Sequence, residues 1–489
     1  MKPTIAVTTL GLLIGLISPG AGGPRVKSVN DKAKRVEDVL TRCYEAGQFN
    51  GAALVASRVQ ILYKGAFGYA NFEWRVPNTT DTKFRIASIS KTFLSILMLQ
   101  LVEKGEVDLD RKVNDYLPGF SRKWGDRVTL RQILTYTSGL PDYNSIPDFF
   151  RQAQAGLMTD DEFLQRIAGH DLLFEPGTKF GYSNDGINVL ARLIETVAGK
   201  SYEQVINERI VEPAMLTQTG YARQEVLLEK RAAGYRQTLA GLENAPFYRP
   251  EAASGLYSTV EDLFRYNQAI WSDKLLSARH KELIGEVSPN GNAYGWLNRK
   301  FALEEPKEEL LVQMSEGAVY GFYSRMLFLP RDDYFIVLLT NVRSPKNYLP
   351  EIADALVRVL YDRPYALPKR SLAPVLRDSI NRSGLQAGLD KYRELKAGQP
   401  EQYDFGEEEL NSLGYHFLTQ KKWPEAAIAV FRLNVEAYPG SGNAYDSLAE
   451  AYMTAGDRVR AAANYKKALE LDPSNANAMM MLKRLAGER

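Results

Sequence analysis

Cysteine and histidine are scarce in this 489-residue sequence, and their scarcity excludes two kinds of chemistry. The single cysteine, Cys43, cannot form an intramolecular disulfide, so we expect a small buried hydrophobic residue. The three histidines, His170, His280 and His416, lie far apart in sequence. This spacing argues against a metal centre, and we expect neither a metal nor another cofactor.

The chain also lacks an excess of either charge. Its 61 lysines and arginines face 59 aspartates and glutamates, which leaves a formal net charge of +2. Proteins that bind nucleic acids neutralise many phosphates with basic side chains, so we expect no nucleic-acid partner. The composition is 45% hydrophobic and 25% charged, as in globular proteins, and the length predicts at least two domains.

The apolar run near the N-terminus is too short for a comfortable membrane span. It covers Ile5–Ile17, 13 residues, whereas a spanning helix needs about 20. Lys2 precedes it and small residues follow at Ser18–Gly23, the order of a secretory signal. We therefore expect a signal peptide over residues 1–24, cleaved near 20–24, and a periplasmic or secreted protein without a membrane span. An uncleaved N-terminal anchor is the alternative.

Strands at both ends of the first domain, with helices between them, predict an α+β fold. Its antiparallel sheet is closed by N- and C-terminal segments, and we place this domain at residues 25–365. The strand patterns lie at 51–56, 60–69, 310–314, 324–329 and 334–341. The helical patterns lie at 27–45, 92–102, 187–198 and 350–361.

The C-terminal part contains an internal repeat. Three residues recur 34 positions later: Ala427 as Ala461, Phe431 as Tyr465 and Pro439 as Pro473. This period is that of tetratricopeptide repeats, pairs of helices that stack side by side. We expect an all-α module of such repeats with a capping helix over 406–489, after a linker or degenerate repeat over 366–405. It either packs on the first domain or recruits a protein partner.

Ser88 and Lys91 form the first candidate for chemistry. They precede a densely apolar helix pattern, and three residues of helical spacing place both side chains on one face. A serine hydroxyl needs a proton acceptor before it attacks, and a lysine held among apolar groups can supply one. The spacing alone is weak, because a helix-capping serine and a solvated lysine would look the same.

A second candidate is the turn-rich loop from Glu175 to Gly186, which carries Tyr182 and Asn184 just before a helix pattern. A tyrosine beside a cationic lysine ionises more easily and can act as a general base. An asparagine amide can donate to a substrate and accept from the lysine. A second Tyr-x-Asn at residues 69–71 belongs to an alternating strand, so we interpret it as structural.

Five stretches, in this order, resemble the class C β-lactamase and D-Ala-D-Ala carboxypeptidase family, peptidase family S12. The resemblance spans about residues 36 to 362. The stretches are residues 50–93, Leu134–Tyr143, Pro176–Asn184, Gly255–Asp262 and Tyr294–Trp296.

This resemblance implies roles for the candidate residues. Ser88 would be the acylated nucleophile, Lys91 its proton partner and Tyr182 the general base, while Asn184 would bind both the substrate and Lys91. The implied fold is β-lactamase/transpeptidase-like: an antiparallel sheet of five or more strands flanked by helices, plus a helical lobe, with the site between them. The implied substrate is a small molecule or a peptide.

The sequence departs from the family at its third motif. Where the family has Lys-Thr-Gly or His-x-Gly, this chain has Ser315-Glu316-Gly317. The family's oxyanion hole uses the backbone N–H groups of the nucleophile and of the residue after the glycine, here Ser88 and Ala318, so those donors remain. A cation that would bind a substrate carboxylate is missing, and such a hydrogen bond is worth roughly 1.5 to 3 kcal/mol. Glu316 would add repulsion if it faces the cleft.

Three hypotheses follow. The leading one is a serine hydrolase that forms an acyl-enzyme on an uncharged or positively charged ester or amide. The second is a weak β-lactamase or D,D-peptidase. The third is a catalytically silent scaffold that holds a ligand while the repeats recruit a partner.

Overall fold

The computed structural model describes residues 29–57, 60–146, 159–223, 225–246, 251–285, 291–304 and 307–487. The expected signal peptide lies outside these ranges. Within them, no helix is both long and apolar enough to cross a membrane.

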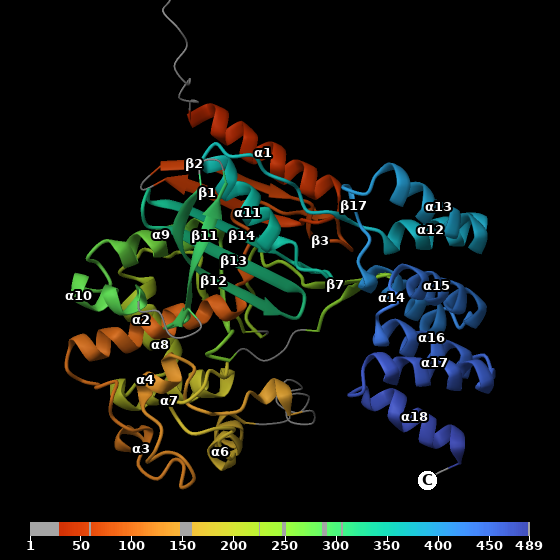
Figure 1. Cartoon of the computed structure of the whole chain (residues 1–489). Helices are drawn as coiled ribbons and strands as arrows, with labels where there is room; N and C mark the ends of the chain where they lie inside the picture. Colours follow the sequence, from red (N-terminus) through yellow and green to blue (C-terminus); the bar gives the residue numbers. More distant parts are fainter. Residues whose placement is uncertain are drawn as a thin grey trace, which may run out of the picture.

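A seven-stranded antiparallel sheet forms the centre of the first domain (Figure 1). Its strand order is β10-β11-β12-β13-β14-β1-β2, so the N-terminal hairpin pairs with the last strand of the C-terminal meander. This arrangement confirms the predicted α+β fold closed by both ends of the domain. The strands are β1 (Gly51–Ser57), β2 (Gln60–Phe67), β10 (Asn292–Ala293), β11 (Trp296–Leu303), β12 (Glu308–Val319), β13 (Phe322–Leu329) and β14 (Tyr334–Thr340).

The central sheet is buried on both faces. In β1, Leu54 faces one hydrophobic core while Val55 faces another, because successive side chains of a strand point to opposite sides. The second core packs β1 and β14 against α1 (Val29–Glu45) and α11 (Leu349–Leu360), and it contains the fully buried Cys43. Burial raises the pKa of the Cys43 thiol to about 12, which suits the predicted role as a packing residue.

The first core lies between the sheet and the helical lobe (Figure 1). The most apolar helix, α2 (Ser90–Glu103), crosses this core and contacts α7 (Asn184–Ala198). The other α-helices in the described residues of this domain are α3 (Val113–Tyr116), α4 (Leu130–Leu134), α6 (Asp160–Gly169), α8 (Tyr202–Ile206), α9 (Val260–Trp271) and α10 (Ala278–Lys281). Short strands complete it: β3 (Tyr69–Asn71), β4 (Val76–Pro77), β5 (Phe84–Arg85), β6 (Gly220–Tyr221), β7 (Tyr235–Thr238), β8 (Gly241–Asn244), β9 (Leu256–Ser258) and β15 (Val342–Arg343).

The C-terminal helices form a column beside the sheet domain (Figure 1). They share one hydrophobic core, in which each of the last helices packs on its neighbour. Helices α15 and α17 are displaced by 34 residues at both ends, in register with the predicted repeat. The elements are β16 (Arg370–Ser371), α12 (Ala373–Ser383), α13 (Leu385–Gly398), β17 (Tyr403–Asp404), α14 (Glu407–Tyr415), α15 (Pro424–Ala437), α16 (Gly442–Thr454), α17 (Arg458–Leu471) and α18 (Ala476–Ala486).

The hairpin β7–β8 connects the two parts of the molecule. At its base, Gly234 packs against Gly321. A methyl group added to Gly321 would lie 2.6 Å from the Cα atom of Gly234. At its tip, Leu239 packs on the core of the helical column, and its carbonyl accepts a hydrogen bond from Arg377 of α12. Lys346 adds an ion pair to Asp404 at 3.1 Å. The hairpin therefore joins the sheet domain, at its base, to the helical column, at its tip.

Replacing Phe431 by alanine should destabilise the helical column. Its ring is fully buried and lies against Gly414, so removal leaves a cavity that costs about 3–5 kcal/mol. Hydrogen–deuterium exchange of the full chain should show faster exchange across α14–α17 only. Val459→Ala on α17, where the side chain is 82% exposed, is the control and should leave exchange unchanged. Equal protection in both variants would contradict this packing.

Candidate active site

Ser88 lies in a short turn between β5 and α2. The turn is a 3-10 helix, η1 (Ala87–Ile89), and Ala87 adopts a positive φ of 48°, a conformation that L-residues rarely hold without support. Support comes from β9: the Ile86 amide donates to the Leu256 carbonyl at 3.0 Å, and the Ser90 hydroxyl accepts from the Leu256 amide at 3.1 Å. The serine thus lies in the 3-10 turn directly before α2.

Lys91 is buried directly behind Ser88. Its side chain is 1% exposed, and its amine donates to Ser88 Oγ at 2.9 Å and to the Ala253 carbonyl at 2.8 Å. Burying an amine is costly unless it is hydrogen-bonded, and these two acceptors meet that requirement. The helical spacing correctly placed the pair, whereas nothing in the sequence singled out Ala253.

Tyr182 closes the other side of the serine. Its hydroxyl donates to Ser88 Oγ at 3.2 Å, and Lys91 Nζ lies 5.3 Å from the centre of its ring. The ring stacks on Tyr136 with centroids 4.9 Å apart, while 40% of the side chain stays exposed. The phenol, 94 residues further along the chain, therefore meets the hydroxyl and the amine at one site.

Asn184 differs from the expectation. Its backbone amide and its side-chain amide both donate to Asp142 Oδ2, at 2.9 and 2.8 Å, and it forms no hydrogen bond to Lys91. The expected contact between Asn184 and Lys91 is corrected: the Ala253 carbonyl takes that place. Asp142 belongs to a stretch that carried the resemblance, yet a sequence pattern does not indicate which side chains meet across 42 residues.

Strand β12 brings its glycine against the nucleophile turn. A methyl group on Gly317 would lie 2.7 Å from the Ser88 amide nitrogen and 2.6 Å from the Ile86 carbonyl oxygen, so only glycine fits without moving the turn. Ala318 follows on the same strand. Ser315 is buried, and its hydroxyl donates to the Gly295 carbonyl at 3.1 Å.

Glu316 does not face the nucleophile. Successive residues of a strand point to opposite sides, so Glu316 lies on the face away from Gly317. Its carboxylate pairs with the buried Arg325 of β13. Glu316 therefore does not repel a substrate carboxylate beside Ser88, because its own carboxylate lies on the other face of β12.

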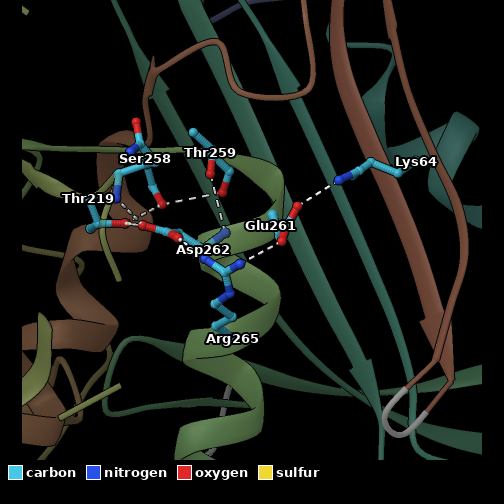
Figure 2. Close-up of polar contacts among 8 residues, drawn as sticks. Lys64, Thr219, Ser258, Thr259, Glu261, Asp262 and Arg265 are labelled. Atoms are coloured by element: carbon cyan, nitrogen blue, oxygen red, sulfur yellow. Dashed lines mark hydrogen bonds and ion pairs between the residues drawn. The ribbon is translucent and has the colours of Figure 1, made fainter. Parts of the chain in front are cut away.

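The stretch Gly255–Asp262 holds β9 in place, a role that the sequence did not reveal. Figure 2 shows its polar network. Asp262 is 1% exposed and accepts from the Thr219 hydroxyl at 2.9 Å, while Thr219 and Ser258 share a hydrogen bond at 2.7 Å (Figure 2). Because β9 pairs with β5, this network positions the strand that leads to Ser88.

Buried carboxyl groups lie beneath the site. Burial, with the nearby charges of Asp142 and Glu251, raises the pKa of Asp185 to about 8. Burial also raises the pKa of Glu251, although Tyr143 donates to it and Lys91 lies nearby. Within the described residues, no group of three or more His, Cys, Asp or Glu side chains has a metal-binding arrangement.

Comparison with known proteins identifies this architecture. The model of the beta-lactamase family matches residues 36–360. Penicillin-binding protein 4* of Bacillus subtilis (strain 168) is 28% identical over 369 residues, which covers 70% of this chain and 78% of that protein.

Solved structures give the same fold. The octameric penicillin-binding protein homologue from Pyrococcus abyssi superimposes with a TM-score of 0.60 at 25% identity, covering 72% of this chain and 82% of that one. The D-amino acid amidase from Ochrobactrum anthropi SV3 gives a TM-score of 0.59 at 22% identity, covering 68% and 99%. These similarities confirm a β-lactamase/transpeptidase-like fold for the first domain.

Gly317→Ala should slow the reaction of Ser88 with a serine-directed fluorophosphonate at least tenfold, since the added methyl group displaces the turn that holds the serine. In-gel labelling against time measures the rate. Gly398→Ala is the matched control, because an added methyl group there meets no atom within 4 Å. Equal labelling rates would mean that the turn adapts without cost.

Asp185→Asn should stabilise the protein increasingly as the pH rises. An acid whose pKa is raised by folding binds its proton more tightly in the folded state, so the wild type loses stability between about pH 4 and pH 8 and levels off above. The difference in melting temperature between variant and wild type should therefore be larger at pH 9 than at pH 5. Asp160→Asn, in the first turn of α6 and exposed, should show no such trend.

Proposed function

This chain belongs to the beta-lactamase family and is a serine hydrolase, and on that premise we propose that it cleaves an ester or amide substrate through an acyl-enzyme on Ser88. One observation carries the proposal: Ser88 Oγ lies 2.9 Å from the Lys91 amine and 3.2 Å from the Tyr182 hydroxyl. Both groups are within reach of the proton that the serine must lose.

In the proposed reaction, Tyr182 acts as a phenolate beside the Lys91 amine, which lies 5.3 Å from the centre of its ring. Ser88 Oγ forms a bond to the substrate carbonyl carbon as its proton passes to this phenolate oxygen. The oxyanion is held by the backbone N–H groups of Ser88 and Ala318, each worth about 3 kcal/mol in the transition state. The bond to the leaving alcohol or amine then breaks, and the leaving group takes the proton from Tyr182. Water attacks the acyl-enzyme by the reverse proton route and frees Ser88.

Uncharged or cationic substrates are favoured over carboxylates. At the third-motif position the chain has Ser315, whose hydroxyl is engaged by the Gly295 carbonyl. The cation of Arg325 is held by Glu316 on the other face of β12. A substrate carboxylate at this position would lack a charge-assisted hydrogen bond of roughly 1.5 to 3 kcal/mol.

Weak β-lactamase or D,D-peptidase activity is the second candidate. The similarity to a penicillin-binding protein favours it, as does the resemblance of the five stretches to the class C and S12 family. Intact-protein mass spectrometry after incubation with benzylpenicillin distinguishes the candidates. A stable adduct favours the second, whereas turnover of a short-chain ester without an adduct favours the first.

The helical column is proposed to be a tetratricopeptide-repeat module that recruits a protein partner. Its support is the 34-residue displacement of α15 and α17, each followed by a proline two residues beyond the helix end. A cavity of ≈ 730 Å³ lies between this column and the sheet domain, with Tyr320 and Arg343 on one side and Tyr415 on the other. The proposal also includes export, which rests on the charged, apolar and small-residue order of residues 2–23.

Ser88→Ala should abolish fluorophosphonate labelling and ester turnover. Lys91→Ala and Tyr182→Phe should each lower kcat/KM by about 10²- to 10⁴-fold, the usual contribution of a proton-transferring group. Tyr69→Phe, in the other Tyr-x-Asn, is the matched control and should keep full activity. A folded wild type that is neither labelled nor active would support the silent scaffold instead.

A further inference from the structure

The carbonyl that receives the Lys91 amine belongs to a short turn. Ala253 lies between Glu251 and Ser254, where the Ser254 amide donates to the Glu251 carbonyl at 3.0 Å. The backbone inside such a turn keeps conformational freedom unless other contacts hold it. The amine of Lys91, 2.8 Å from the Ala253 carbonyl, is therefore placed correctly only if the turn itself is held.

Asn188 of α7 holds this turn at two points. The side chain is buried, and its Oδ1 accepts a hydrogen bond from the Ala253 amide at 3.3 Å. Its Nδ2 donates to Glu251 Oε2 at 3.2 Å. Asn188 thus connects the turn that receives the Lys91 amine to the helix that begins two residues after Tyr182.

The two partners of Asn188 determine which way its amide faces. A backbone N–H can only donate, so the Ala253 amide requires the oxygen, whereas a carboxylate can only accept, so Glu251 requires the NH₂. Rotating the amide by half a turn would set donor against donor and acceptor against acceptor. Glu251 therefore fixes Asn188 in the orientation that holds Ala253.

Glu251 also lies among the charged groups of the site. Its carboxyl group is near the cations of Lys91 on α2 and Arg85 on β5, and the Tyr143 hydroxyl donates to it. Asp185 of α7 is a second carboxyl group close enough to influence it. Burial raises the pKa of Glu251, whereas the donors and cations around it favour the carboxylate. That carboxylate offsets positive charge beside Lys91.

We propose that Asn188 and Glu251 are positioning residues for Lys91. Glu251 orients the Asn188 amide, and the amide holds Ala253. The carbonyl of Ala253 then holds the Lys91 amine beside Ser88. This inference rests on the proposed acyl-enzyme function and adds to it two residues that the sequence patterns did not indicate.

The first test replaces the Asn188 amide by a carboxyl group. In Asn188→Asp, two carboxyl groups face each other, so both contacts of position 188 can form only while the pair shares a proton. Turnover of p-nitrophenyl butyrate by the full chain is measured at pH 5 and pH 8, at the isosbestic wavelength of p-nitrophenol. Each rate is divided by the folded fraction from near-ultraviolet circular dichroism. The variant should be at least tenfold less active than wild type at pH 8 and should approach it at pH 5.

The second test exchanges the two groups. Asn188→Asp combined with Glu251→Gln again pairs one carboxylate with one carboxamide, and the carboxylate can still accept from the Ala253 amide. This double variant should therefore regain activity at pH 8, to within about threefold of wild type. Glu251→Leu alone removes the acceptor for Asn188 and should lose at least tenfold per folded molecule. A merely structural role would lower the folded fraction and leave the activity of each folded molecule unchanged.

Asn267→Asp is the matched control. Asn267 is also buried in a helix of the same domain, and its side-chain oxygen accepts from Trp271 at 3.2 Å, which a carboxylate can do as well. Its activity per folded molecule should equal that of the wild type at both pH values.

Two results would overturn the inference. One is a ratio of Asn188→Asp to wild-type activity that stays the same at pH 5 and pH 8. The other is a double variant that is no more active at pH 8 than Asn188→Asp alone. In both cases a wild type that labels with fluorophosphonate at Ser88 and hydrolyses the ester leaves the acyl-enzyme function standing. Absence of both labelling and ester turnover in the folded wild type would instead refute that function.

Discussion

The buried amine of Lys91 is the interaction on which the rest of the site depends. An amine removed from water needs acceptors, and it has two: the Ser88 hydroxyl, three residues earlier, and the Ala253 carbonyl, 162 residues later. To place Ser88 there, β5 must be held by β9, and β9 in turn by the network around Asp262. Polar contacts between segments far apart in sequence, such as the one between Tyr266 and Thr92 across 174 residues, then fix the helix that carries the amine.

Local patterns made much of this arrangement predictable. The Ser88–Lys91 spacing, the loop before α7 and the alternation in the outer sheet strands are properties of short segments, and short segments determine which face a side chain occupies. The contacts that define the chemistry of the site are of another kind. Asp142 with Asn184, Lys91 with Ala253 and Glu316 with Arg325 join separate segments, so no pattern in the sequence indicates them.

Position 315 carries a serine in place of a basic residue, so β12 places no cation beside Ser88. Glu316 forms an ion pair with Arg325 on the other face of β12, and the Ser315 hydroxyl donates to the Gly295 carbonyl. This strand therefore presents backbone groups and no charged side chain to the site. The carboxyl groups of the site lie elsewhere, where Asp142, Asp185 and Glu251 are close enough to influence one another and burial raises the pKa of Asp185 to about 8.

The hairpin β7–β8 contacts both the sheet domain and the helical column. Its base is fixed by the close approach of Gly234, directly before β7, to Gly321, directly before β13, and its tip packs against α12. A hairpin clamped at both ends leaves little freedom for insertions or deletions. The length of the hairpin therefore sets the distance between the sheet and the helical column.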